Sequence, residues 1–289
     1  MKYALLFLLC LPTQLPAQQA DTLHKGIASV EDAGKRANLT VGTVVANNIS
    51  YYGQVAVQPM PYAAVAGSLT FPSGLYFTSM AYKILNSAID TAIISASNFG
   101  VGYGYSFTEN FSGDIGYNYT VYPKNSPFLQ ASTPHSLSAT LAYEHWLTSA
   151  LTGDYNFGNG HDFFVTLANS KELNLGSISD RDIVYFTPEI NMTAGTQEFY
   201  RTYKKNNSNR GKGQAKGQGQ NQPNPNAGMQ TISTKNFGLI SYNFKLPLSY
   251  NRNSYLLELA YQLSVLNNNF IETDKNGHSF FTFSFYYQF

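Results

Sequence analysis

The chain has 289 residues, of which 12% are charged and 15% are aromatic, and its formal net charge is +1. Soluble domains carry about 25% charged residues, so this composition argues against an ordinary soluble protein, and the small net charge argues against a nucleic-acid partner. No apolar run after residue 20 is long enough for a transmembrane helix. Few charges, many tyrosines and phenylalanines and no long apolar run are typical of a transmembrane β-barrel wall.

The N-terminus reads as a secretory signal peptide. Lys2 supplies a basic start, and residues 4–11 form an apolar stretch that is too short to span a bilayer. Cleavage is expected after Ala17, with Ala20 as the alternative, and the single cysteine, Cys10, is removed with the leader. The mature chain therefore forms no disulfide. The expected segments are a signal peptide over 1–17, a periplasmic tail over 18–40 and a barrel domain over 41–289.

Apolar and polar residues alternate along most of the domain, as strands with two different faces require. In the clearest segment, Leu257 and Leu259 share one face, and Glu258 and Gln262 share the other. A soluble β-sandwich also alternates, but its solvent face should carry many Lys and Glu, whereas these polar faces hold mostly Ser, Thr, Asn, Gly and Tyr. The segments expected as strands are 43–54, 62–72, 75–84, 92–107, 110–122, 135–146, 149–158, 162–171, 183–199, 235–248, 254–266 and 279–289.

These segments predict an all-β fold, a closed antiparallel transmembrane β-barrel of about twelve strands, with about ten or fourteen as open alternatives. Closure requires the first and last strands to pair, because an open edge is not tolerated in lipid. An even strand count places both termini on one side, expected to be the periplasm. Short turns are expected there at 72–74, 108–110, 147–149 and 250–253, and longer outer connections at 123–134, 200–234 and 267–278. The connection 172–182 is long for a periplasmic turn and breaks this pattern.

Charged strand residues fall on the polar faces, as expected because a Lys or Arg in mid-bilayer costs roughly 2–4 kcal/mol. Such residues either line a water channel or hydrogen-bond across a narrow lumen and fill it, and the sequence does not decide between the two. The expected lumen-lining set is Asp114, Asn118, Glu144, Asp154, Asn156, Glu189, Lys245, Glu258 and Gln262.

Three further features concern the wall. Lys83 faces inward only if Tyr76, Thr78, Met80 and Tyr82 face lipid, and Lys171 must lie beyond the membrane at a strand end. In a third segment, the glycines of G-V-G-Y-G at 100–104 form an inward strip without side chains. Such a strip allows close strand coiling, the approach of an inner loop, or an aqueous path.

The connection 201–233 is rich in Gly, Gln, Asn and Pro, and carries six basic residues without an acidic one from Arg201 to Lys216. This composition cannot offset the chain entropy of ordering, so the loop is expected to be disordered. It either contacts lipopolysaccharide phosphates or is a solvated insertion at a loop tip.

The C-terminal strand alternates aromatic and polar residues and ends in Y-Q-F, with Phe285, Tyr287 and Phe289 on one face. This ending resembles the insertion signal of bacterial outer-membrane barrels. From about residue 40 onward the chain is similar to outer-membrane β-barrels of Gram-negative bacteria, in particular uncharacterised Bacteroidota barrels of comparable length. The matching segments are L-P-A-Q-Q, P-Y-A-A-V-A-G-S-L-T-F-P-S-G-L-Y, T-P-E-I-N-M-T-A-G-T-Q and the terminus itself. The resemblance implies the outer membrane, with its lipid, its lipopolysaccharide and the barrel-insertion machinery as partners; it carries no functional residue and leaves the oligomeric state open.

Acyl-processing enzymes also use such barrels, with a Ser–His pair at the wall. Only His145 lies well within a strand end, but the adjacent Glu144 points to the opposite face and no serine two residues away completes a pair. No metal-ligand spacing is present, so no catalytic residue, cofactor or metal is expected. The leading hypothesis is a non-enzymatic barrel that acts as a small pore or a structural or surface protein. A barrel-wall acyl hydrolase and an adhesin-like module using 201–233 are the alternatives.

Overall fold

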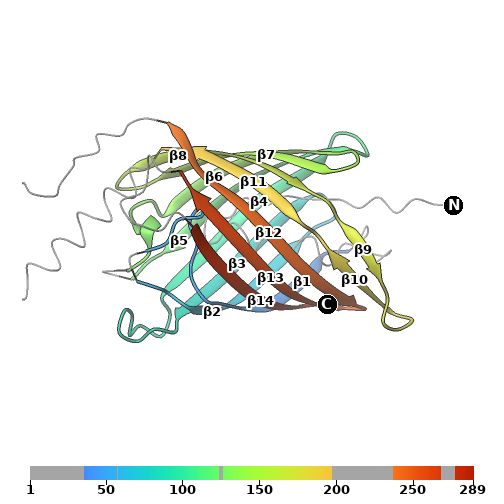
Figure 1. The fold of residues 1–289 in the computed structure, drawn as a ribbon, viewed down its shortest axis with the longest axis horizontal. Helices are drawn as coiled ribbons and strands as arrows, with labels where there is room; N and C mark the ends of the chain where they lie inside the picture. Colours follow the sequence, from blue (N-terminus) through green and yellow to red (C-terminus); the bar gives the residue numbers. More distant parts are fainter. Residues whose placement is uncertain (1–35, 57, 124–125, 197–236, 268–276) are drawn as a thin grey trace, which may run out of the picture.

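The computed structural model describes residues 36–56, 58–123, 126–196, 237–267 and 277–289 (Figure 1). In these ranges no helix is both long and apolar enough to cross a bilayer. The strands are β1 (Asn38–Ala46), β2 (Tyr62–Thr70), β3 (Leu75–Ile84), β4 (Ala96–Ser106), β5 (Phe111–Val121), β6 (His135–Glu144), β7 (Thr148–Phe157), β8 (His161–Ser170), β9 (Leu173–Gly176), β10 (Asp182–Phe186), β11 (Glu189–Gly195), β12 (Gly238–Arg252), β13 (Tyr255–Leu266) and β14 (Gly277–Gln288); a short 3-10 helix, η1 (Leu129–Ser132), precedes β6.

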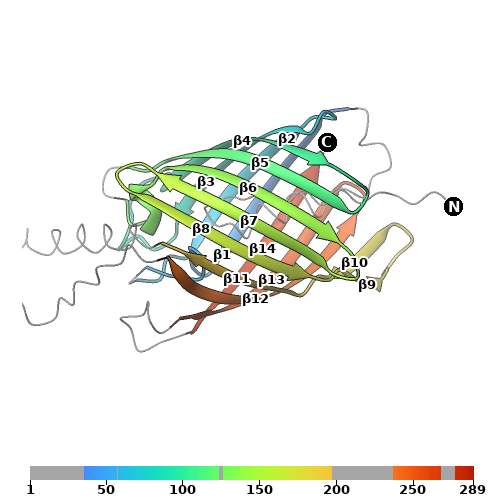
Figure 2. The ribbon, with the colours of Figure 1, turned by 90° about the horizontal axis from the view of Figure 1, so that it is seen from above.

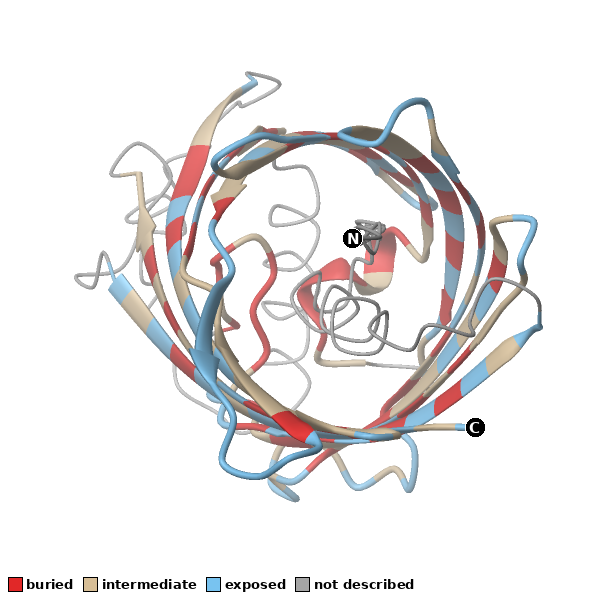
Figure 3. Ribbon diagram, turned by 90° about the vertical axis from the view of Figure 1, so that its right-hand side faces the viewer, coloured by how far each residue is buried: buried red, intermediate tan, exposed pale blue. Residues whose placement is uncertain are grey.

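The strands close into an antiparallel barrel (Figures 1, 2 and 3). Strands β1 to β8 pair in chain order, β8 pairs with β11, β11 with β12, and β14 returns to β1 over the register Thr40↔Gln288 to Ala46↔Thr282. Of the 14 strands in the sheet, β9 and β10 lie outside the ring, which leaves twelve in the wall. The closed barrel expected from the sequence is therefore confirmed.

The two faces of the wall differ as the alternation predicts. Outward side chains are large, apolar and uncovered by protein, as with Val65 (56% exposed) and Phe283 (50% exposed). Inward neighbours such as Ser284, Thr140 and Asn98 are small or polar and buried. Burying apolar surface is favourable by about 25 cal/mol per Å², so a wall with this exterior is stable where hydrocarbon covers it.

The barrel has two unlike ends. At the short-turn end lie the connections 71–74, 107–110, 145–147 and 253–254, together with the start of β1 and the end of β14. At the long-loop end lie the connections 47–61, 85–95 and 122–134, the tight turn 158–160, and two connections that lie mostly outside the described residues.

The first predicted strand, 43–54, is wrong in its bounds, since β1 occupies Asn38–Ala46. The chain leaves the wall at Asn47 and Asn48. The Asn48 side-chain Oδ1 accepts the backbone N–H of Ile49 (2.9 Å) and of Met60 (2.8 Å), which ties both ends of the connection together. Asparagine favours such local side-chain bonds over a strand ladder, so residues after Ala46 form a loop.

The predicted strand 183–199 is also corrected, because it is split into β10 and β11 at Thr187–Pro188. Proline cannot donate to the ladder and interrupts it. The long connection 172–182 is accounted for by a hairpin, since β9 pairs with β10 beyond the end of β8. This hairpin extends from the short-turn end, which is also the end of the barrel at which Figure 1 marks the C-terminus.

The structure decides which side chains of β3 face inward, and it shows one irregularity in β12. In β3, Tyr76 and Tyr82 are each 2% exposed and face inward, so Lys83 has outward parity and lies at the strand's outer end, where its ammonium donates to the Ala92 carbonyl. Lys171 lies one residue past β8 and donates to the Trp146 carbonyl, at the strand end where it was expected. In β12, Ile240 has the same sequence parity as the outward-facing Tyr242 and Phe244 but is 0% exposed. The pairs Thr193↔Ser241 and Ala194↔Leu239 skip it, which makes a bulge that turns it inward.

Candidate functional site

The connection 47–61, here called the inner loop, folds into the barrel. Ile49, Tyr51, Gln54 and Met60 are buried. The loop's contacts reach β7 and β8, which lie across the ring from β1 and β2, and β12, which lies three strands from β1. Figure 3, viewed along the barrel, shows buried segments inside the ring of strands. The inner loop therefore crosses the lumen.

The tip of the inner loop is a tight turn. Tyr51 N–H donates to the Gln54 carbonyl (2.9 Å), and Gln54 N–H donates to the Tyr51 carbonyl (3.0 Å). The central residues Tyr52 and Gly53 have φ of 51° and 85°, as in the type I′ turns that close β-hairpins. Glycine adopts this conformation freely, but for a tyrosine it costs roughly 1–2 kcal/mol, so contacts elsewhere must hold Tyr52 in place.

Three wall strands hold Tyr52. Its ring stacks on Phe164 of β8 with 4.0 Å between centroids and 17° between planes. Its hydroxyl donates to Asp154 Oδ2 of β7 (2.9 Å), and its carbonyl accepts from Ser241 Oγ of β12 (2.7 Å). Stacking and a hydrogen bond to a carboxylate each contribute on the order of 1 kcal/mol or more, which is enough to offset the backbone strain. The Tyr52 seat is defined as Asp154, Phe164 and Ser241.

Tyr51 adds a second attachment next to the seat. Its hydroxyl oxygen accepts from Asn156 Nδ2 (2.9 Å), and its ring meets the edge of Phe164 at 5.9 Å. Gly53 lets the turn lie close to β12, because a Cβ at this position would lie only 2.8 Å from Asn243 Oδ1. A side chain at this position would therefore require the turn or the Asn243 amide to shift.

A second connection, 122–134, covers another part of the long-loop end. Phe128 and Leu129 beside η1 are buried in one apolar cluster with Tyr62 and Tyr82 of β2 and β3. The Phe128 ring lies 6.4 Å from Tyr82 and 5.6 Å from Tyr122. The lumen at this end is thus narrowed by apolar packing near β2 and β3, and by the inner loop near β7, β8 and β12.

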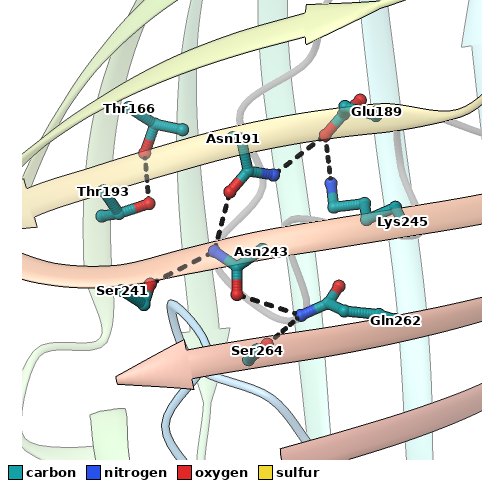
Figure 4. A network of polar contacts seen from close by, with 9 residues as sticks. All are labelled: Thr166, Glu189, Asn191, Thr193, Ser241, Asn243, Lys245, Gln262 and Ser264. Atoms are coloured by element: carbon teal, nitrogen blue, oxygen red, sulfur yellow. Dashed lines mark hydrogen bonds and ion pairs between the residues drawn. The ribbon is translucent and has the colours of Figure 1, made fainter. Parts of the chain in front are cut away.

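A hydrogen-bonded network runs along the inner wall across β11, β12 and β13 (Figure 4). Lys245 Nζ lies 2.8 Å from Glu189 Oε1, which also accepts from Asn191 Nδ2 (2.9 Å). Asn243 Nδ2 donates to Asn191 Oδ1 (2.7 Å), and Gln262 Nε2 donates to Asn243 Oδ1 (3.3 Å). The chain of amides fixes these side chains as a rigid polar surface beneath the inner loop, because Asn243 also donates to Ser241 Oγ (3.2 Å), which holds Tyr52.

The structure places eight of the nine residues expected to line the lumen on its inner face, and the ninth, Glu144, is exposed. Asp154 and Asn156 meet the inner loop, and Glu189, Lys245 and Gln262 belong to the amide network. Nearer the short-turn end, Asp114 accepts from Tyr76 (3.0 Å) and Glu258 from Ser249 (3.0 Å). Asn118 is buried farther along β5, toward the long-loop end. Glu144 is exposed at the end of β6. Sequence reasoning missed Tyr51, Tyr52, Phe164 and Ser241; the Y-Y-G-Q run after two asparagines is the one signal that could have indicated a tight turn.

The glycine strip on β4 accommodates side chains of the neighbouring strands, a use that was not considered from the sequence. The Tyr76 ring of β3 lies over Gly102, where it occupies the space that a Cβ would need, and its hydroxyl lies 3.0 Å from the Cβ position of Gly116 on β5. The aromatic side chain of Tyr76 therefore covers the strip at Gly102, and the side chains of Thr78 and Asn118 cover it at Gly100. Tyr286 of β14 covers Gly42 of β1 in the same way.

The remaining candidates lie outside the lumen. His145 is exposed in the turn 145–147, where its Nδ1 accepts the Leu147 N–H (2.8 Å) and its ring stacks on Trp146. Phe285, Tyr287 and Phe289 are exposed on the outer face at the short-turn end. Within the ranges that the structure covers, no group of three His, Cys, Asp or Glu side chains could hold a metal. The signal peptide, most of the tail and the loop 201–233 lie outside the described residues.

Neither the family models nor the curated proteins include a match to this chain. Among solved structures it is similar to the KdgM porin (10% identity, TM-score 0.47, 86% of this chain and 99% of that one). It is also similar to an outer membrane channel from Pseudomonas putida F1 (10% identity, TM-score 0.46, 88% and 96%) and to LpxR from Salmonella typhimurium (7% identity, TM-score 0.45, 86% and 99%). At these scores the likenesses carry no functional inference.

The location of the protein follows from its wall. Only helices and closed barrels satisfy every backbone group within a bilayer, and barrels with an apolar exterior and a polar interior are those of outer membranes. Here a closed ring exposes large apolar side chains outward and buries polar ones inward. The chain is thus an outer-membrane β-barrel protein with twelve strands in its wall.

Proposed function

We propose that the protein is a narrow, non-enzymatic outer-membrane pore in which the inner loop forms the constriction. The observation that carries this proposal is the placement of Tyr52 against the Tyr52 seat, on the far side of the barrel from the strands that the loop connects. A barrel of about eight strands is filled by side chains and one of about sixteen leaves an open channel. In a barrel of intermediate size, with twelve strands in its wall, a loop that folds inward determines how wide a path through the lumen stays open to solutes.

The inner wall supports an aqueous path. Below the inner loop it carries carboxylates, amides and hydroxyls, including Asp114, Glu189, Lys245 and Glu258. Such groups suit water and small polar solutes. A barrel that served only as a membrane anchor would not need a strained tyrosine at the tip of a loop.

The orientation is part of the proposal. In bacterial barrels the short turns face the periplasm and the long loops face outward. On that basis both ends of the barrel domain lie at the periplasmic side, and solutes meet the inner loop from outside.

Single-channel conductance in planar bilayers tests the pore. The wild type should give small, discrete currents, and Tyr52→Gly should give larger ones, because glycine suits the turn but leaves the seat empty. Tyr155→Phe, which changes an exposed residue on the outer face, is the matched control and should conduct as the wild type does. Silent membranes with both the wild type and Tyr52→Gly would refute the pore.

The enzyme alternative receives no support at its candidate residue. The Nδ1 of His145 already accepts the Leu147 N–H in a turn, so this nitrogen is not available to a serine. The adhesin alternative stays a prediction, because 201–233 lies outside the described residues.

A further inference from the structure

The Tyr52 seat belongs to the wall and not to the loop that fills it. Asp154 also accepts from Ser138 of β6, and the Phe164 ring lies over Gly195 of β11, where a Cβ would overlap it. Both contacts join wall strands to one another. The seat therefore keeps its shape when the inner loop is absent, and a rigid, preformed site loses little free energy to ordering on binding.

The chemistry of the seat defines what it accepts. One wall is the flat face of Phe164, at a ring-stacking distance of 4.0 Å. At the far edge of the stacked ring, Asp154 accepts a hydroxyl at 2.9 Å. A six-membered ring that carries a hydroxyl on its outer edge satisfies both requirements, whether it is a phenol or a pyranose sugar.

The docked loop is held under strain. Tyr52 has φ of 51°. The Gln54 Nε2 and Asn156 Oδ1 atoms are buried beside the turn, and none of the described residues offers them a hydrogen-bond partner. A buried unsatisfied polar atom costs about 1–3 kcal/mol, and water would satisfy both atoms if the loop withdrew. The docked state of the inner loop is therefore only slightly lower in free energy than an open state in which the loop has withdrawn. Strained residues of this kind cluster at ligand clamps and switches.

We propose that the Tyr52 seat is a binding site for hydroxylated six-membered rings, and that Tyr52 occupies it as an internal ligand which such a ring displaces. The consequence for conduction rests on the proposed pore, since displacement would withdraw the inner loop from the lumen. The binding itself does not depend on conduction.

Isothermal titration calorimetry on the purified full-length protein in detergent tests the binding. The probes are p-cresol, which is the tyrosine side chain as a free molecule, and methyl β-D-glucopyranoside. Tyr52→Gly empties the seat and should bind at least one probe about tenfold or more tightly than the wild type, in which Tyr52 competes. Tyr52→Phe, whose ring still fills the seat but which lacks the hydroxyl, is the matched control and should gain clearly less than Tyr52→Gly.

The outcomes distinguish phenolic ligands from sugars, and they test the binding site separately from the proposed pore. Binding of p-cresol alone assigns phenolic rings, and binding of the glucoside alone assigns sugars. Equal heats for Tyr52→Gly and Tyr52→Phe with both probes would overturn the site, whatever the conductance shows. Should Tyr52→Gly fail to fold, hydrogen exchange of the wild-type amides at 51–54 decides: a probe that displaces the loop speeds it, and no change with either probe overturns the proposal.

Discussion

Tyr76 lies across Gly102 of the neighbouring strand and donates a hydrogen bond from its hydroxyl to Asp114 Oδ1 at 3.0 Å. The arrangement joins β3, β4 and β5 through one buried ring. It uses the missing side chain of Gly102 as the place where the ring rests, as aromatic residues do when they cover glycines in sheets.

Gly102→Ala should destabilise the barrel by about 1–3 kcal/mol, the usual cost of overpacking. The added methyl displaces the Tyr76 ring and breaks its hydrogen bond to Asp114. Urea unfolding in lipid vesicles, followed by the fluorescence of Trp146, measures the loss. Gly67→Ala is the control, since a Cβ there meets its nearest atom at 3.5 Å and should leave the midpoint unchanged.

The Glu189–Lys245 pair gives a second stability prediction. Lys245→Met removes the cation 2.8 Å from a carboxylate. Breaking a fully buried pair costs about 3–5 kcal/mol of stability. The loss of stability here should lie toward the lower limit, because the Lys245 side chain is 16% exposed. The same unfolding assay measures it.

Glu189→Gln combined with Lys245→Met should recover much of that loss, because no uncompensated charge remains. A double variant as unstable as Lys245→Met would show that charge pairing is not the cause. The exposed Lys171→Met, at the end of β8, controls for the loss of a lysine in general.

The wall was predictable because alternation is a local property of each strand. The bounds of β3 match the predicted 75–84 at both ends, and every outward aromatic of β14 could be assigned from the sequence. Pairing of each strand with its chain neighbour then follows from short turns. The bulge at Ile240 was not predictable, since it depends on how β12 meets β11.

The candidate site was only half predictable, for a physical reason. Asp154 and Asn156 could be placed on an inward face from their own strand. The partner of Asp154, Tyr52, lies 102 residues earlier, and Ser241 lies 189 residues after Tyr52. Whether a connection folds into the lumen or away from it depends on such distant contacts, and no local pattern in residues 43–54 carries that information.

The hairpin formed by β9 and β10 should be held by a charge at its tip. Asp182 Oδ1 accepts the N–H groups of Ser179 (2.9 Å) and Ile178 (2.7 Å), and Oδ2 accepts the Tyr250 hydroxyl (3.0 Å). These bonds, the one from Ser179 foremost, lower the pKa of Asp182 below its ordinary 3.8. A carboxylate with a depressed pKa stabilises the folded hairpin above its unfolded pKa, and that contribution is lost as pH falls through the folded pKa.

A nitroxide spin label at Asp180→Cys should therefore report an immobile tip from pH 7 down to about pH 4, with mobility rising only at lower pH. Asp182→Asn should give the mobile spectrum already at pH 7. Glu109→Gln, in the turn 107–110, is the matched control and should leave the titration unchanged. A tip that loosens near pH 6 would contradict the role of Asp182.

The constriction can be locked covalently, because the mature chain is expected to contain no cysteine. A Cβ on Gly53 would lie 3.0 Å from the Cβ of Ser241, and disulfides need about 3.8 Å, so a small shift of the turn permits a bond between Gly53→Cys and Ser241→Cys. Oxidation should hold the inner loop against β12 and suppress the larger openings of the channel, and reduction should restore them. The same current in both redox states would show that the inner loop does not set the conductance. A cysteine pair at Ser149 and Asn169, which face each other across β7 and β8 on the outer wall, supplies the control: its oxidation links two wall strands and should leave the current as it was.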